Sequence, residues 1–376
     1  MGRKNIISIF LTFLASELRY LLQRIVVFFN GDSRKISPRE NSVLMVEFMP
    51  HHGEVIPGIV KYLLDLKHNV DVLMYSEQRG VNVIDLGLFT CFDANDKLRI
   101  FPRSGYSINL FLRSKKVHAY KRIIFNTMHD KLFTYLRFYR INIDKLKPIG
   151  MIHNSENFNK YFYTENIASL VRMECINRKP PVVVNAHYFG EYPPGEKSKT
   201  TVFFTLNSKD LLRRNIRLLF EACDRLYEKG ITDFIVKITG NGVPVPEKYC
   251  KNIVSLGFLN FKLMYDAIHS SDFILALIDS ASVHYTNKAS GTYQLSYGFC
   301  KPIILHEKFS PVSGFNNENS VLYSDNDELS AAMEKSINLS GSDYKTMVNS
   351  LSELEKSIYS SSLENLRKLL LNDEKT

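Results

Sequence analysis

The stretch SGTYQLSYGFCKPII occupies residues 290–304 and combines a helix signal with a strand signal. Small polar residues open it, a short helix-like segment follows, and Pro302 ends that segment because proline cannot continue a helix. The apolar run Ile303-Ile304-Leu305 then has the composition of a buried strand. The helix would begin near Ser290, where the unpaired N–H groups of its first turn offer a binding place for an anion.

Similar apolar runs recur along the chain and alternate with helix-like segments. The runs that predict strands are residues 42–49, 70–75, 98–101, 122–127, 149–152, 182–185, 201–206, 234–242, 252–259, 273–279 and 301–307. Apolar residues repeat at helical spacing over 55–67 and 208–230. Strands that alternate with helices form parallel sheets covered on both faces, so the sequence predicts an α/β protein.

A loop-rich stretch, HYFGEYPPGEKSK (187–199), separates two such series. With 376 residues, the chain is long enough for two domains. We therefore expect two Rossmann-like doubly wound domains that face each other across a cleft, with ligands at the carboxyl ends of their strands. The expected parts are an N-terminal amphipathic helix (1–32), a first domain (40–186), a linker (187–200), a second domain (201–330) and C-terminal helices (331–376).

The chain carries a formal net charge of +9, which favours an anionic partner such as nucleic acid, a membrane surface or a phosphorylated small molecule. Its basic residues are scattered and match no nucleic-acid-binding module, so nucleic-acid binding is the weakest of these interpretations. The five cysteines are odd in number and form no C-x-x-C pair. This usage is typical of a cytoplasmic protein without disulfides or a zinc site.

The apolar segment 5–29 predicts a helix with one narrow polar stripe. Its uncharged run, 5–16, is shorter than the roughly 20 residues that cross a bilayer. We expect this helix to lie in a membrane interface, which would place the protein peripherally on the inner face of the cell membrane. Packing of the helix against the protein body, or a signal sequence, are the alternatives.

The second half of the chain carries an ordered series of short motifs. These are DFIVKITGNG (233–242), NIVSLGFLN (252–260), YDAIHSSDFILAL (265–277) and the stretch at 290–304. Their order resembles the donor-binding half of the GT-B glycosyltransferases. In the first half, PHHGEVIPG (50–58) is similar to that family's first loop, with Glu54 in place of a histidine. No G-x-G-x-x-G fingerprint or P-loop is present, which argues against dinucleotide oxidoreductases and ATPases.

The resemblance implies a binding site for a nucleotide-sugar, whose diphosphate would lie at the start of the helix near Gly291. The residues it assigns to donor binding are Ser290, Gly291, Thr292, Lys209, Arg214, Gly240, Gly242, Gly257 and Phe258. A helix N-terminus and an arginine both suit phosphate oxygens. The plainer interpretations are an ordinary helix cap, a solvated helix face and strand-end turns.

Transfer with inversion needs a base that accepts the proton of the attacking hydroxyl. Glu54 is our first candidate, from its place in the first loop, and His52 is the second, since its ordinary pKa is near ~6.5. Many retaining members carry a Glu-x7-Glu pair, but Asn287 and Leu295 stand at those positions, so the stereochemical outcome stays open. GT-A enzymes hold a metal with an Asp-x-Asp pair at a strand end, and we expect no such pair in this chain, so we expect neither a metal nor a cofactor.

The sequence therefore predicts a membrane-associated glycosyltransferase of surface polysaccharide biosynthesis, of the O-antigen (lipopolysaccharide) or capsule type. Its partners would be a nucleotide-sugar donor, UDP-linked, and a glycan or polyprenyl-diphosphate-linked acceptor. A nucleotide-sugar epimerase or hydrolase of the same architecture is the main alternative, and a basic nucleic-acid-binding protein is the second.

Overall fold

The structure is a computed structural model. It describes residues 36–48, 52–78, 81–82, 86–93, 95–128, 132, 135–136, 139, 141–154, 166–172, 180–207, 214–240, 244–282 and 288–371. The helix expected at 1–32 lies outside the described residues, as do Lys209 and Gly242.

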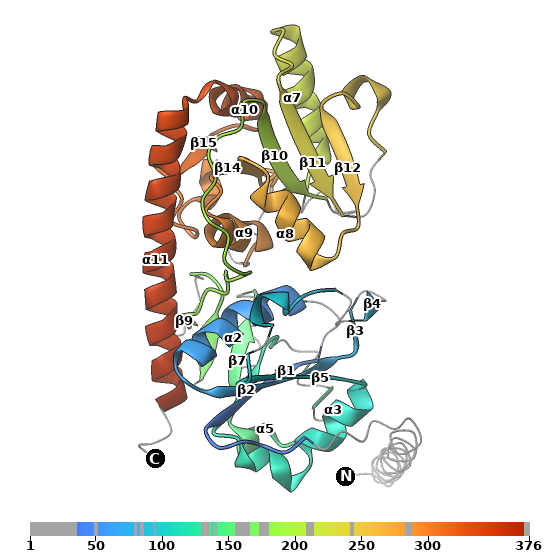
Figure 1. Ribbon diagram of the computed structural model, residues 1–376, viewed down its shortest axis with the longest axis vertical. Helices are drawn as coiled ribbons and strands as arrows, with labels where there is room; N and C mark the ends of the chain where they lie inside the picture. The colour runs from blue at the N-terminus through green and yellow to red at the C-terminus, as the bar shows by residue number, and fades with distance from the viewer. Residues whose placement is uncertain are drawn as a thin grey trace, which may run out of the picture.

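The first lobe is built on a seven-stranded parallel sheet with the order β5-β2-β1-β6-β7-β8-β9 (Figure 1). Its strands are β1 (Ser42–Glu47), β2 (Asn69–Tyr75), β5 (Leu98–Arg103), β6 (Arg122–Phe125), β7 (Ile149–Ile152), β8 (Ile167–Ser169) and β9 (Val182–Val183). Alternate residues of β1 face opposite layers. Val43 and Met45 pack in the layer that contains α2 (Ile56–Asp65), whereas Leu44 and Val46 pack in the layer that contains α3 (Gly105–Leu112).

The second lobe is built on a six-stranded parallel sheet with the order β12-β11-β10-β13-β14-β15. Its strands are β10 (Thr201–Leu206), β11 (Phe234–Thr239), β12 (Ile253–Gly257), β13 (Phe273–Leu275), β14 (Ile303–His306) and β15 (Ser320–Tyr323). Its helices are α7 (Ile216–Glu228), α8 (Phe261–His269), α9 (Gly291–Phe299) and α10 (Leu329–Asn338). The second lobe stands above the first in Figure 1.

Shorter elements complete the described chain. They are the 3₁₀ helices η1 (Gly53–Val55), η2 (Thr90–Phe92), η3 (Lys115–Ala119), η4 (Glu247–Tyr249), η6 (Glu307–Phe309) and η7 (Asn326–Glu328), the helix α5 (Ile143–Leu146) and the antiparallel pair β3 (Glu77–Gln78) and β4 (Val81–Asn82).

The predicted α/β class with two doubly wound sheets is confirmed, and an observed strand overlaps each predicted one. The short strands β3, β4, β8 and β15 were not predicted. The helix predicted over 208–230 is observed from Ile216, and residues 208–213 lie outside the described part of the chain. Asn215 caps it by accepting a hydrogen bond from the Arg217 N–H.

The C-terminal helix α11 (Gly341–Leu371) runs along one side of both lobes (Figure 1). Its early residue Tyr344 belongs to the core of the second lobe, whereas Leu366 and Leu370 belong to the core of the first. The Leu370 carbonyl also accepts a hydrogen bond from Arg122 of β6, at 3.0 Å. Apolar burial at both ends of one helix therefore ties the two lobes together.

Gly298 fixes the distance between α9 and the chain that connects the lobes. A Cβ at this position would overlap the backbone carbonyl oxygen of His187, so Gly298→Ala must push α9 away. We expect a loss of about 1–3 kcal/mol in the free energy of unfolding, measured by urea denaturation. Gly341→Ala is the control, since a Cβ there meets nothing within 4 Å. Equal stability of the two variants would contradict the close approach.

Candidate active site

Each sheet has a switch point where the chain changes direction along the sheet. In the first sheet, the chain moves outward from β1 through β2 to β5 and returns to β6 on the other side of β1. In the second sheet, β13 in the same way lies beside β10 on the side away from β11. Loops diverge at these points and leave room at the carboxyl ends of the strands, which is where doubly wound sheets bind ligands.

At the switch point of the second lobe, an arginine meets the first turn of α9. Arg214, which is buried, follows β10, and its Nη2 lies 3.4 Å from the Ser290 Oγ and also donates to the Thr292 Oγ1. Ser290 is the N-cap residue of α9, but its side chain accepts no hydrogen bond from the first turn. Gly291 borders open space, since a Cβ there would meet nothing within 4 Å. A guanidinium and a helix N-terminus thus converge beside an open position.

Two glycines come together farther along the same edge of the sheet. The Gly240 N–H donates to the Gly257 carbonyl at 2.8 Å, and both residues have positive φ, 124° and 63°. A Cβ on Gly240 would lie 2.9 Å from the Asn207 carbonyl oxygen, so only glycine fits this turn. Phe258 follows β12, and 49% of its surface is exposed. The structure places Gly240, Gly257 and Phe258 together at the carboxyl ends of β11 and β12.

At the switch point of the first lobe, His52 and Glu54 lie in the loop that joins β1 to α2. The His52 Nδ1 is 3.7 Å from the Glu54 Oε1, and His52 adopts the left-handed conformation with φ of 68°. The ring of His153, which follows β7, lies 4.4 Å from the His52 ring. His153 Nε2 in turn contacts the Asn126 carbonyl oxygen at 2.8 Å. Two histidines and a carboxylate therefore form one cluster.

The surroundings of the two histidines shift their pKa values in opposite directions. Burial by itself lowers the pKa of His52, but the nearby Glu54 carboxylate, together with the charge of Glu47, outweighs burial and raises this pKa above its ordinary value. Burial, joined by the positive charge of His52, lowers the pKa of His153 to about 3. His153 therefore stays neutral at physiological pH, and His52 is the histidine that can exchange a proton there.

Backbone contacts connect the two switch points. The Ala289 N–H donates to the His153 carbonyl at 3.0 Å, and Asn154 forms an isolated antiparallel bridge with Lys288. The residues that immediately precede α9 therefore lie against the histidine cluster of the first lobe. The positive charge of Lys288 acts to lower the pKa of both His52 and His153, so Lys288 belongs to the same electrostatic environment.

Several residues at the junction were missed by sequence analysis. They are Glu47 at the end of β1, Asn126 and Thr127 after β6, and Lys288 before α9. Glu47 did carry a signal, because it is the charged residue in the otherwise apolar run 42–49. Asn126, Thr127 and Lys288 carried none, since ordinary polar residues at strand ends have no distinguishing pattern.

The expectation that the chain lacks an Asp-x-Asp pair at a strand end is wrong. Asp325 and Asp327 follow β15, which was not predicted. The Asp325 side chain accepts from the Asp327 N–H, and Asp327 pairs with Arg225 at 2.5 Å, so both carboxylates have protein partners. Among the described residues, no three His, Cys, Asp or Glu side chains gather in a way that could hold a metal ion.

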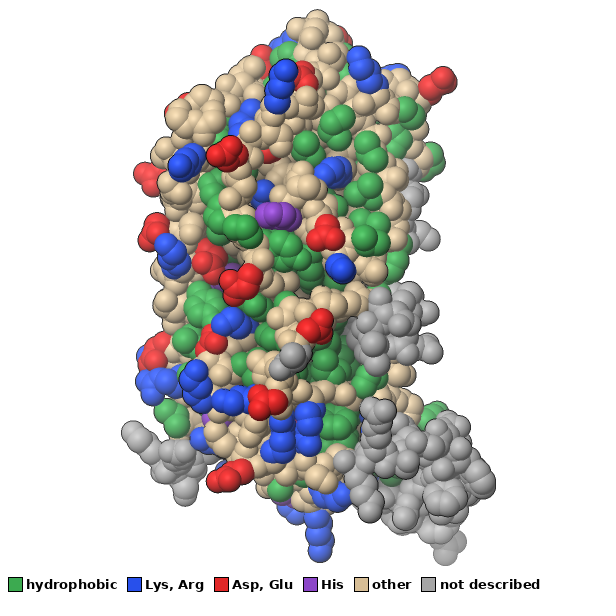
Figure 2. All heavy atoms as spheres, in the orientation of Figure 1, with side chains coloured by type: hydrophobic (Ala, Val, Ile, Leu, Met, Phe, Trp, Pro, Cys, Tyr) green, Lys and Arg blue, Asp and Glu red, His purple; other side chains and the backbone are tan. Residues whose placement is uncertain are grey.

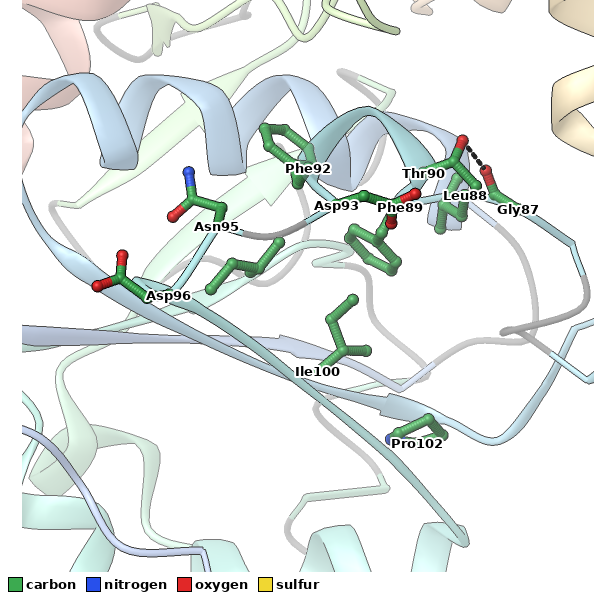
Figure 3. A pocket seen from close by; sticks show the side chains of 11 residues that line it. Gly87, Leu88, Phe89, Thr90, Phe92, Asp93, Asn95, Asp96, Ile100 and Pro102 are labelled. Atoms are coloured by element: carbon green, nitrogen blue, oxygen red, sulfur yellow. Dashed lines mark hydrogen bonds between the residues drawn. The ribbon is translucent and has the colours of Figure 1, made fainter.

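A hollow of about 570 Å³ lies away from these residues (Figure 3). It is formed by the loop at 87–96 and β5, with Phe89, Phe92, Ile100 and Pro102 in its lining. None of the candidate residues contributes to it. In the portion of the chain that the structure describes, no helix combines the length and the apolar character needed to cross a membrane.

Comparisons with known proteins identify the fold. No family model and no curated protein matches the sequence. A glycosyltransferase from Rickettsia africae matches with a TM-score of 0.55 and 12% identity, over 89% of this chain and 99% of that chain. This chain has the GT-B glycosyltransferase fold. AviGT4, a glycosyltransferase involved in avilamycin A biosynthesis, matches with a TM-score of 0.51 and 13% identity, over 88% of this chain and 98% of that chain.

OtsA matches with a TM-score of 0.51 and 12% identity, over 88% of this chain and 99% of the OtsA chain. Identities this low show a shared GT-B fold alone, because the same fold supports different chemistry. The activity therefore has to be argued from the residues at the lobe junction.

His153 should make the protein sensitive to acid. In the unfolded chain it takes up a proton near pH ~6.5, whereas in the folded chain its pKa is about 3, so stability falls as the pH drops through this window. Between pH 7 and pH 5 the wild type should lose about 2 kcal/mol that His153→Gln does not lose. Urea denaturation at both pH values measures this. His118→Gln, at an exposed position, should follow the wild type, and an equal acid loss in His153→Gln would refute the assignment.

Proposed function

We propose that this protein is a glycosyltransferase that moves a sugar from a nucleotide-diphosphate-sugar to a glycan or lipid-linked acceptor, without a metal ion. The observation that supports the proposal best is the meeting of Arg214 with Ser290 and Thr292 at the start of α9, next to the cluster of His52 and Glu54. An anion site and a proton acceptor on opposite lobes are the two parts that glycosyl transfer requires.

The diphosphate of the donor would lie beside Gly291. The N–H groups of the first turn of α9 would donate to its oxygens, and Arg214 would offer its forked donors from the other side. Gly257 and Phe258 would border the nucleotide base. Lys209 and Gly242 lie outside the described residues and are assigned to the donor from sequence alone. A UDP-linked sugar is the donor that we propose.

In the transfer step, the oxygen of the acceptor hydroxyl attacks the anomeric carbon and forms the new glycosidic bond. The bond from that carbon to the phosphate oxygen breaks, and the nucleoside diphosphate leaves with the electron pair. The proton of the hydroxyl passes to Glu54 or to His52, which lie 3.7 Å apart. The start of α9 and Arg214 stabilise the charge that develops on the leaving diphosphate. Attack from the face opposite the leaving diphosphate inverts the configuration of the anomeric carbon.

The setting that we propose is surface polysaccharide synthesis, of the lipopolysaccharide or capsule type, on the inner face of the cell membrane. The sequence pattern of residues 5–29 supports membrane association. Basic side chains gather on the lower lobe of the face drawn in Figure 2. Exposed lysines of this lobe include Lys115, Lys116, Lys121, Lys145 and Lys147. Such lysines attract anionic headgroups or a lipid-linked diphosphate.

Donor binding is tested by a thermal-shift panel of nucleoside diphosphates and nucleotide-sugars. A ligand at 100 times its Kd should stabilise the wild type by about 2.7 kcal/mol. Arg214→Gln should lose most of this stabilisation, because the guanidinium that faces the α9 N-terminus is gone. Arg217→Gln is the matched control, since Arg217 is exposed on the neighbouring turn. If no compound in the panel raises the melting temperature, the transferase proposal fails.

Proton acceptance is tested with Glu54→Gln and His52→Gln in a transfer assay. The variant that lacks the base should lose about 10²–10⁴-fold in kcat while it binds the nucleoside diphosphate as tightly as the wild type. Full activity in both variants would place the base elsewhere. Release of free or rearranged sugar from the donor without an acceptor would instead support an epimerase or hydrolase.

A further inference from the structure

Glu47 is a buried carboxylate at the switch point of the first lobe. It is the last residue of β1, and none of its surface is exposed. Its Oε2 accepts a hydrogen bond from the Asn126 Nδ2 at 2.5 Å and another from the Thr127 Oγ1 at 2.8 Å. Burial of a charge is costly even where hydrogen bonds offset part of the cost, so a buried carboxylate at a ligand-binding edge of a sheet is a candidate for a functional role. The transfer step described above gives Glu47 no role.

Asn126 connects Glu47 to both histidines of the cluster. The amide nitrogen that donates to Glu47 also donates to the His52 carbonyl oxygen, at 3.0 Å. The backbone carbonyl of Asn126 contacts His153 Nε2 at 2.8 Å. One asparagine thus fixes the carboxylate, the main chain of His52 and the ring of His153 relative to one another.

His52 needs such a restraint. Its φ of 68° lies in the left-handed region, which costs a non-glycine residue roughly 1–2 kcal/mol. A strained residue keeps its conformation only where its surroundings hold it. The hydrogen bond from Asn126 to the His52 carbonyl is such a contact, and Glu47 orients the amide that makes it.

We propose that Glu47 is a positioning residue for His52: through Asn126 it holds the His52 main chain so that the ring faces Glu54. The inference deepens the proposed function, since it concerns the same pair of candidate bases. Its structural part, the control of His52 by Glu47, does not depend on which reaction the site performs.

Among the described residues, four charged or titratable groups act on or contact His52. Glu54 lies on η1, Glu47 on β1, His153 follows β7 and Lys288 precedes α9. Glu54 and Glu47 favour the protonated ring, whereas Lys288 opposes it. Removal of the Glu47 charge should therefore shift the balance toward the neutral ring.

The experiment is an NMR titration of the His52 ring in the full chain. In Glu47→Gln, which keeps the shape of the side chain and one acceptor oxygen but removes the charge, the pKa of His52 should fall below the wild-type value. The matched control is Asp71→Asn, because Asp71 is equally buried on the neighbouring strand β2 but binds Arg39 and Arg99 instead. It should leave the His52 titration unchanged. An unchanged pKa in Glu47→Gln would overturn the proposal.

A second variant cuts the connection without removing the charge. Asn126→Ser leaves Glu47 in place but cannot reach both Glu47 and the His52 carbonyl. It should lower kcat about 10–100-fold and leave the affinity for a nucleoside diphosphate unchanged. Wild-type kcat in Asn126→Ser would also overturn the proposal. If Glu47→Gln does not fold, the kcat of Asn126→Ser is the measurement that tests the positioning role.

The two readouts separate this inference from the proposed function. A shift of the His52 titration in Glu47→Gln supports the positioning role even if no sugar transfer is found, in which case the transferase proposal alone fails. A third outcome is that the protein transfers sugar, the His52 titration in Glu47→Gln is unshifted and Asn126→Ser keeps the wild-type kcat. In that case the transferase proposal holds, and Glu47 has no positioning role.

Discussion

The hydrogen bond from the Ala289 N–H to the His153 carbonyl joins the lobes where both sheets present the carboxyl ends of their strands. Parallel strands all end on the same edge, so each sheet gathers its loops at one place. At this bond the loop clusters of the two sheets lie beside each other, with the start of α9 on one side and His52 on the other. Together with the Asn154–Lys288 bridge and the packing of α11 on both lobes, this contact sets the candidate donor site beside the candidate bases.

Two buried carboxylates in the first sheet show how differently a charge can be held. Asp71 pairs with two arginines and accepts a hydrogen bond from Tyr120, which makes it part of a structural ion-pair network. Glu47 instead accepts hydrogen bonds from the neutral Asn126 and Thr127. The charge of Glu47 also acts on the site, because it helps to raise the pKa of His52.

The candidate donor site was largely predictable, because its parts are local or lie at strand ends. Ser290 stands at a predicted helix start, the family resemblance assigned Thr292 and Arg214 to the same site, and the structure brings the three side chains together. Glu47 and Asn126 lie 79 residues apart, and their contact exists because β6 returns to pair with β1. Local periodicity in the sequence does not indicate which strands are neighbours, so this contact could not be predicted.

The sequence by itself determined the α/β class, the positions of the predicted strands and the small polar start of α9, since these depend on side-chain alternation, helical spacing and turn residues. Only the tertiary structure decided which strands are neighbours, that α11 packs against both lobes, and that His52, His153, Glu47 and Asn126 form one cluster. Those contacts join residues far apart in the chain, and it is the burial of apolar surface between whole layers, not any local signal, that brings them together.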